Sequence, residues 1–156
     1  MTTIALPKNI EDIQEPEALP EDYYRMRIVE EPLVDSNKKK KEGGPSAPGA
    51  GDNLILSMRV ISDDPEYNGR PFKKWLGLPS EADRTDIMQS GQTREDQKIG
   101  MLAKVEEAFS GSRPEGNEIN LRAGMEAWCY ISSGLDQSGT RFVNDLDFMQ
   151  ELKPVN

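Results

Sequence analysis

The 156-residue chain contains no histidine and one cysteine, Cys129. Without histidine, the usual serine and cysteine triads, an imidazole base and every histidine-containing metal site are excluded. A single cysteine forms no internal disulfide, and its place inside an apolar run is typical of a small buried side chain. We therefore expect a non-enzymatic protein that needs no metal and no other cofactor.

Long hydrophobic runs are also missing. No stretch approaches the roughly 18 apolar residues of a membrane span, and the N-terminus has neither the basic start nor the apolar run of a signal peptide. We expect a soluble, cytoplasmic protein without a membrane partner. The hydrophobic content of 35% is low for a compact globule, so part of the chain is expected to lie outside the core.

Acidic residues are numerous but carry no recognisable catalytic or metal-binding motif. The pairs at 63–64, 106–107 and 145/147 have no companion residues that would set their pKa values apart, and two carboxylates alone are a weak metal signal. The glycines between positions 43 and 51 match neither the phosphate-binding loop nor the dinucleotide fingerprint. These patterns indicate solvated surface and loop.

Composition divides the chain into one domain and less regular segments. Residues 1–22 hold six acidic side chains, three prolines and one lysine, which predicts an acidic disordered tail over 1–21. Residues 35–52 combine four consecutive lysines with glycine and proline, as expected of a mobile loop. Residues 22–150 are predicted to form the domain, and 151–156 a short C-terminal tail.

Hydrophobic periodicity predicts a mainly β domain with one or two helices. Alternation indicates strands near 23–29, 53–61, 70–76, 125–131 and 140–149, and Asn68-Gly69 is a strong hairpin signal before the third. A helix is expected from Thr93 to about Gly111, and a shorter helical piece at 80–88. The helix is predicted to bury Ile99, Leu102, Ala103 and Phe109, and the strands to bury Phe72 and Phe142. The order β-β-β-α-β-β is that of the five-stranded oligonucleotide/oligosaccharide-binding barrel, the OB-fold.

Aromatic and basic side chains recur at positions that this alternation turns away from the core. In the first strand, Tyr24 and Met26 fall on one side and Tyr23, Arg25 and Arg27 on the other. Rings stack on bases while cations neutralise phosphates, so this combination is typical of a surface for single-stranded nucleic acid. The candidate binding residues are Tyr23, Arg25, Arg27, Lys38, Lys39, Lys40, Lys41, Arg59, Arg70, Lys73, Lys74, Trp75, Trp128, Tyr130 and Arg141.

Each candidate also has a plain structural alternative. A lysine run in a glycine-rich loop is often a solubilising linker, and Arg25 and Arg27 could line a solvated sheet face. Trp75 and Trp128 could lie in the core, as large rings often do in small domains, although their strand parity favours exposure.

The net charge of −9 opposes phosphate binding. Residues 1–22 account for −5 of it, and the remainder of the chain carries −4. Binding would therefore require a local basic patch. We expect the acidic tail to compete for that patch, so that deletion of residues 1–20 would tighten DNA binding.

Several short motifs resemble a known group of proteins. The pattern Tyr24-x-Met26-x-Ile28, a long loop, Glu66-Tyr67-Asn68-Gly69-Arg70-Pro71-Phe72, a helix, and then Gly124-Met125, Tyr130-Ile131, Asn144 and Phe148 is similar to bacteriophage-encoded single-stranded DNA-binding-like proteins. The resemblance covers about residues 22–150. It implies an OB-fold protein in the host cytoplasm that coats or protects single strands during phage DNA replication or recombination, with replication or recombination proteins as further partners. The acidic tail at the N-terminus departs from the usual plan of that family.

A different class of function is also open. An acidic phage accessory or structural protein would bind a host or virion protein through its N-terminal tail or its lysine and glycine loop. Aromatic rings in one groove with the basic residues favour nucleic acid, whereas an exposed apolar patch without basic neighbours favours a protein partner.

Overall fold

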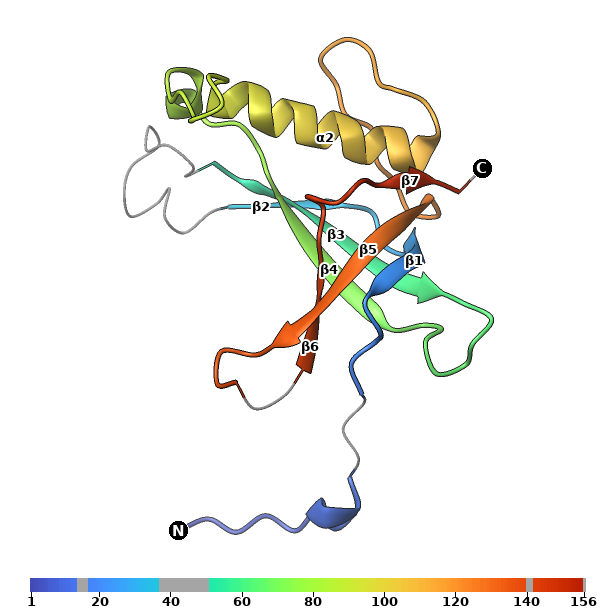
Figure 1. The fold of residues 1–156 in the computed structure, drawn as a ribbon. Helices are drawn as coiled ribbons and strands as arrows, with labels where there is room; N and C mark the ends of the chain where they lie inside the picture. Colours follow the sequence, from blue (N-terminus) through green and yellow to red (C-terminus); the bar gives the residue numbers. More distant parts are fainter. Residues whose placement is uncertain (14–16, 37–50, 140–141, 156) are drawn as a thin grey trace.

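The computed structural model describes residues 1–13, 17–36, 51–139 and 142–155 (Figure 1). Its strands form one antiparallel sheet: β1 (Asp22–Ile28), β2 (Leu33–Asp35), β3 (Asn53–Ile61), β4 (Pro71–Gly77), β5 (Glu126–Leu135), β6 (Phe142–Leu146) and β7 (Lys153–Pro154). The helical elements are α2 (Arg94–Ser110) and two 3-10 turns, η1 (Ile10–Asp12) and η2 (Glu81–Arg84). The expectation of a mainly β protein with one long helix is confirmed.

The central strand of the sheet is β1, which pairs with β3 on one side and β5 on the other. The β2 strand continues the line of β1 along the same edge of β3, and β4 pairs with β3 from the other edge. Beyond β5 lie β6 and the short β7. The sheet has seven strands in the described part of the chain. No strand pair joins β4 to β6 there, so the sheet is open. The five-stranded closed barrel is not observed.

The hydrophobic core lies on the inward face of the strands. Alternation in β1, β3 and β5 buries side chains at every second position, as the period of two requires: Met26, Ile28, Leu56, Met58, Val60, Ala127, Cys129 and Ile131. Burial of Cys129 is confirmed, and burial raises the pKa of its thiol to about 12. The helix α2 lies across one end of the sheet (Figure 1) and contributes Leu102, Val105 and Phe109.

The ends of α2 follow from its sequence. The Thr93 hydroxyl accepts a hydrogen bond from the Asp96 N–H at 3.1 Å, and Gly111 ends the helix with a φ of 86°, which favours glycine. The predicted burial of Ile99 is wrong, because its side chain is 48% exposed. Every buried residue of α2 lies at or after Leu102, so the first turns of the helix lie beyond the packed part of the sheet.

The packed domain is longer at both ends than the sequence suggests. Leu19 is fully buried. The Leu19 N–H donates to Asn144 Oδ1 at 2.7 Å, and Asn144 Nδ2 donates to the Leu19 carbonyl at 2.9 Å. The core therefore begins before the predicted boundary at residue 22. At the other end, β7 pairs with β5, so residues 153–154 belong to the sheet rather than to a tail. No helix within the described ranges is long and apolar enough to cross a membrane.

Two more expectations are corrected in the loops. Phe142 is 63% exposed, because it stands at the hairpin end of β6, past the core. Part of the predicted mobile loop at 35–52 is ordered by pairing: Asp35 belongs to β2, and the carbonyl of Asp52 accepts the Leu78 N–H at 2.8 Å. Positions 37–50 lie outside the described residues.

Candidate nucleic-acid interface

The outward positions of β4, β3, β1, β5 and β7 form one surface, which we call the outer face. Strand register places its side chains in rows across the sheet. Arg25 lies between Ile61 of β3 and Trp128 of β5, and Tyr23 lies opposite Tyr130. The next row contains Arg59, Arg27 and Glu126. Candidates that are far apart in sequence are therefore brought together by the central position of β1.

Aromatic rings gather at the β1–β5 part of the outer face. The Tyr23 and Tyr130 rings pack edge to face, with centroids 5.2 Å apart. Trp128 is 37% exposed and Trp75 is 52% exposed, so both tryptophans lie at the surface rather than in the core. A hollow of about 420 Å³ opens beside Trp128, lined by Tyr23, Tyr24, Arg25, Ile61, Ser62, Asp63 and Trp128. Of the three rings that line the hollow, Trp128 is exposed, Tyr23 is half-buried, and Tyr24 packs against the core.

A lysine that sequence reasoning missed completes this cluster. Lys153 lies on β7, directly across from Trp128, and its Nζ is 4.2 Å from the centroid of the Tyr23 ring. That distance is typical of a cation–π contact. The strand β7 is only two residues long, so no alternation in the sequence could have revealed it.

The two arginines of β1 share one carboxylate. The Arg25 and Arg27 guanidinium groups lie 2.5 and 2.6 Å from the two oxygens of Glu126. Burial raises the pKa of Glu126, whereas hydrogen bonds from Arg27 and Arg25 lower it. The hydrogen bonds outweigh burial, so the pKa lies below its ordinary value. Glu126 is therefore ionised at neutral pH, and the three groups together carry one positive charge. Its outward position beside Trp128 and Tyr130 was visible in the sequence, but its pairing across the sheet was not.

A second carboxylate fixes Tyr130. The Tyr130 hydroxyl donates to Glu21 Oε2 at 2.7 Å. This hydrogen bond, together with burial, raises the pKa of Tyr130 to about 12. Hydrogen bonds from the Ser133 N–H and from Tyr130 lower the pKa of Glu21. The phenol thus stays neutral, and its ring is held against Tyr23.

The other candidates take different positions. Lys73 is exposed on the outer face opposite Ser57, and Arg59 Nη1 donates to the Gly69 carbonyl at 3.1 Å. Arg70 lies outside the cluster, because it donates to the carbonyls of Glu66 and Glu17. Lys74 points inward. The candidates Lys38, Lys39, Lys40, Lys41 and Arg141 lie outside the described residues.

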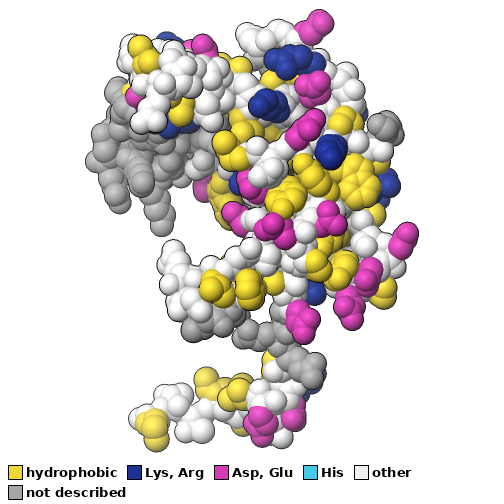
Figure 2. All heavy atoms as spheres, in the orientation of Figure 1, with side chains coloured by type: hydrophobic (Ala, Val, Ile, Leu, Met, Phe, Trp, Pro, Cys, Tyr) yellow, Lys and Arg dark blue, Asp and Glu magenta, His cyan; other side chains and the backbone are white. Residues whose placement is uncertain are grey.

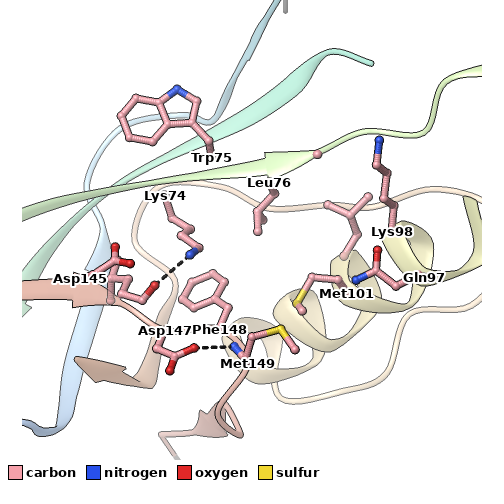
Figure 3. Close-up of a pocket in the computed structure, with 13 residues that line it drawn as sticks. Lys74, Trp75, Leu76, Gln97, Lys98, Met101, Asp145, Asp147, Phe148 and Met149 are labelled. Atoms are coloured by element: carbon pink, nitrogen blue, oxygen red, sulfur yellow. Dashed lines mark hydrogen bonds between the residues drawn. The ribbon is translucent and has the colours of Figure 1, made fainter. Parts of the chain in front are cut away.

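A second hollow, which we call the β4–β6 groove, lies where a closed barrel would join those strands. It measures about 430 Å³ and is lined by Leu76, Met101, Phe148 and Met149 among others. Figure 3 shows Lys74 reaching across it, where its Nζ donates to the Leu146 carbonyl at 2.8 Å and lies 5.3 Å from the Phe148 ring centroid. Lys74 is therefore engaged inside the fold, not on the outer face.

Surface charge on the molecule is mixed. Figure 2 shows hydrophobic side chains beside both basic and acidic ones on the face turned to the viewer. The chain matches no protein-family model, no curated protein and no solved structure.

Proposed function

We propose that this chain is a non-enzymatic single-stranded DNA-binding protein and that its outer face is the binding surface. The observation that carries this proposal is the grouping of partly exposed rings on β1 and β5 with cations on β1 and β7. Tyr23, Trp128 and Tyr130 offer flat surfaces, and Arg25, Arg27 and Lys153 lie among them. Stacking accepts any base, and the cations neutralise the backbone, so the binding would depend little on sequence.

The strand order supports an OB-like architecture for this function. The path β4-β3-β1-β5-β6, with α2 between β4 and β5, has the sequence of strands found in an OB barrel that is left open between its third and fifth strands. In that fold, ligands bind on the second and third strands and the adjoining loops. Here β3 and β4 take those places and present Arg59 and Lys73, whereas the ring cluster lies beside them on β1 and β5. The protein would coat or protect single strands during phage DNA replication or recombination in the host cytoplasm.

The acidic groups of the outer face set the expected strength of binding. Glu126 neutralises one of two arginine charges, and Asp63 lines the aromatic hollow. Affinity would therefore be modest, and its dependence on salt would be shallow, because few cations of this surface are free of a neighbouring carboxylate.

The test is a titration of tryptophan fluorescence with oligo-dT at several salt concentrations, with duplex DNA as a control. We expect saturable quenching that weakens with salt and is absent with duplex. The Trp128→Ala variant should bind about 5- to 150-fold more weakly, since one stacked base is worth about 1–3 kcal/mol. Phe142→Ala removes an exposed ring outside the outer face and should bind normally. No quenching of the folded protein at low salt would reject the proposal.

A second candidate function is binding of a host or virion protein. It is favoured by an apolar row at the far end of the outer face, where register places Leu33, Ile55 and Trp75 on adjacent strands. Leu33 is 64% exposed and Trp75 is 52% exposed. An exposed apolar row of this kind is common at protein interfaces. In the same titration, this function predicts no response to DNA.

A further inference from the structure

The N-terminal arm, residues 1–13, exposes a series of apolar side chains. Figure 1 shows the arm lying apart from the sheet, and its hydrogen bonds within the described part of the chain are internal to η1. More than half of each of these side chains is exposed: Met1, Ile4, Leu6, Ile10 and Ile13. Figure 2 shows this separate group of hydrophobic side chains. A concentration of exposed apolar residues marks an interaction segment.

The β4–β6 groove is an apolar site that remains open in the same chain. In Figure 3, Met101 of α2 and Phe148 lie side by side along it, with Met149 next to them. Leu76 from β4 completes the apolar lining. The carboxylates of Asp145 and Asp147 also line the groove. Lys74 and Lys98 line it as well, but Lys74 donates to the Leu146 carbonyl and Lys98 is paired with Asp83 at 2.7 Å. The groove thus combines an apolar floor with charges of both signs, and its two lysines already have other partners.

The backbone around the groove suits an added extended segment. Within the described residues, β4 pairs only with β3, and β6 only with β5, so each has one edge without a neighbouring strand. The Leu146 carbonyl of β6 accepts a hydrogen bond from the Lys74 side chain on this edge, where a neighbouring strand would otherwise supply a backbone N–H. Unpaired strand edges accept an extended peptide through its backbone, while pockets receive alternate side chains.

The sequence of the arm matches this groove. In an extended segment, Ile4, Leu6 and Lys8 point to one side. The first two would lie on the apolar floor, and the lysine would approach the carboxylates of Asp145 and Asp147. Pro7 is compatible with an edge strand, because proline lacks only its own backbone N–H and an edge strand has one side without a partner.

The arm of the same molecule is directed elsewhere. Residues just after it are fastened to the body, since the Glu17 carbonyl accepts from Arg70 and Leu19 is bonded to Asn144. The arm leaves the body on the side away from α2 (Figure 1), whereas α2 lines the groove. We propose that the N-terminal arm of one molecule binds in the β4–β6 groove of a second copy. The contact joins two different surfaces, so it generates either closed assemblies, in which arms are exchanged, or open chains of molecules.

The test is sedimentation of the full chain over a range of roughly 10 µM to 1 mM, because a small interface associates weakly. The mass of the unsubstituted chain should rise above the monomer mass of 17.5 kDa as concentration increases. Leu6→Asp in the arm and Met101→Glu in the groove should each remain monomeric. Ile99→Asp changes an exposed apolar residue outside the groove and should associate like the unsubstituted chain. Circular dichroism establishes that each variant is folded.

Mixing the two monomeric variants gives a sharper result. One retains an intact groove and the other an intact arm, so the mixture should form dimers that grow no further. A charge exchange provides a second route if Met101→Glu does not fold: Lys8→Glu and Asp145→Lys should each weaken association, and the double variant should restore it. A monomer throughout the concentration range, or self-association unaffected by these changes, would overturn the proposal. None of these outcomes depends on DNA binding.

Discussion

Replacement of Glu126 with glutamine should tighten DNA binding. Glu126 is the carboxylate that lies 2.5 and 2.6 Å from Arg25 and Arg27. Glutamine keeps the size of the side chain but removes its charge, so both guanidinium groups become available to phosphates. The net charge of the outer face rises by one. A binding-site residue whose removal improves binding is an unusual expectation, and it follows only if these arginines contact the DNA.

The structure sets the size of this effect. For single strands, each additional neutralised phosphate increases the slope of log affinity against log salt by about 0.7. One such contact corresponds to about a fivefold gain between 500 mM and 50 mM salt, and two contacts would double the change in slope. The two arginine side chains are 40% and 44% exposed, which limits the cost to folding, but Glu126 itself is 13% exposed, so the glutamine must keep its hydrogen bonds to both arginines. Exposed ion pairs contribute only about 0.2–1 kcal/mol each.

The assay is oligo-dT binding by Glu126→Gln and by the unsubstituted chain from 50 mM to 500 mM salt. Glu118→Gln is the matched control, because it removes the same charge from an exposed position in the loop after α2. Only Glu126→Gln should steepen the salt dependence. An equal gain in both variants would assign the effect to overall charge. Unchanged or weaker binding by Glu126→Gln would refute the placement of the DNA on these arginines.

Two further predictions concern stability. Leu19→Ala should lower the free energy of unfolding by about 2–5 kcal/mol, since the Leu19 side chain is 1% exposed. The control Leu6→Ala changes an exposed residue and should alter the free energy of unfolding by less than about 0.5 kcal/mol in urea denaturation. Equal effects of the two substitutions would contradict the burial of Leu19. Stability should also fall with acid. The pKa values of Glu21 and Glu126 lie below the ordinary 4.5 in the folded protein, so the unfolded chain binds protons more readily, and the contribution present above about pH 4.5 is lost as pH drops through the folded values. Urea denaturation at pH 7 and pH 3 should show a smaller loss for Glu126→Gln than for the unsubstituted chain, and an identical loss would reject this origin.

Most of the regular structure could be predicted from the sequence because it depends on local patterns. The alternation in 53–61 coincides with β3, and Thr93 and Gly111 mark the ends of α2. The outward parity of Tyr23, Trp75 and Trp128 also follows from the period of two. These signals are local, so they do not require knowledge of which strands pair.

The remaining features depend on contacts between distant segments. The strands β2 and β7 are three and two residues long, too short to show alternation, and they exist because a neighbouring strand edge is available. Leu19 is buried by β6, which nothing near it in the sequence indicates. Lys153 and Glu126 join the site only through the register of β5. The exposure of Ile99 likewise reflects where α2 crosses the sheet.

The pair of hydrogen bonds between Leu19 and Asn144 has a consequence for how the chain folds. The two residues are separated by 125 positions, and β1, which follows Leu19 directly, obtains its second neighbour only from β5. During folding, the apolar side chains of β1 are therefore covered completely only after the distant strands β5 and β6 have docked. Long-range closure of this kind is slow. Docking of β5 and β6 is thus the step that should limit the rate at which this domain folds, and β1 and β3 keep apolar surface exposed until it is complete.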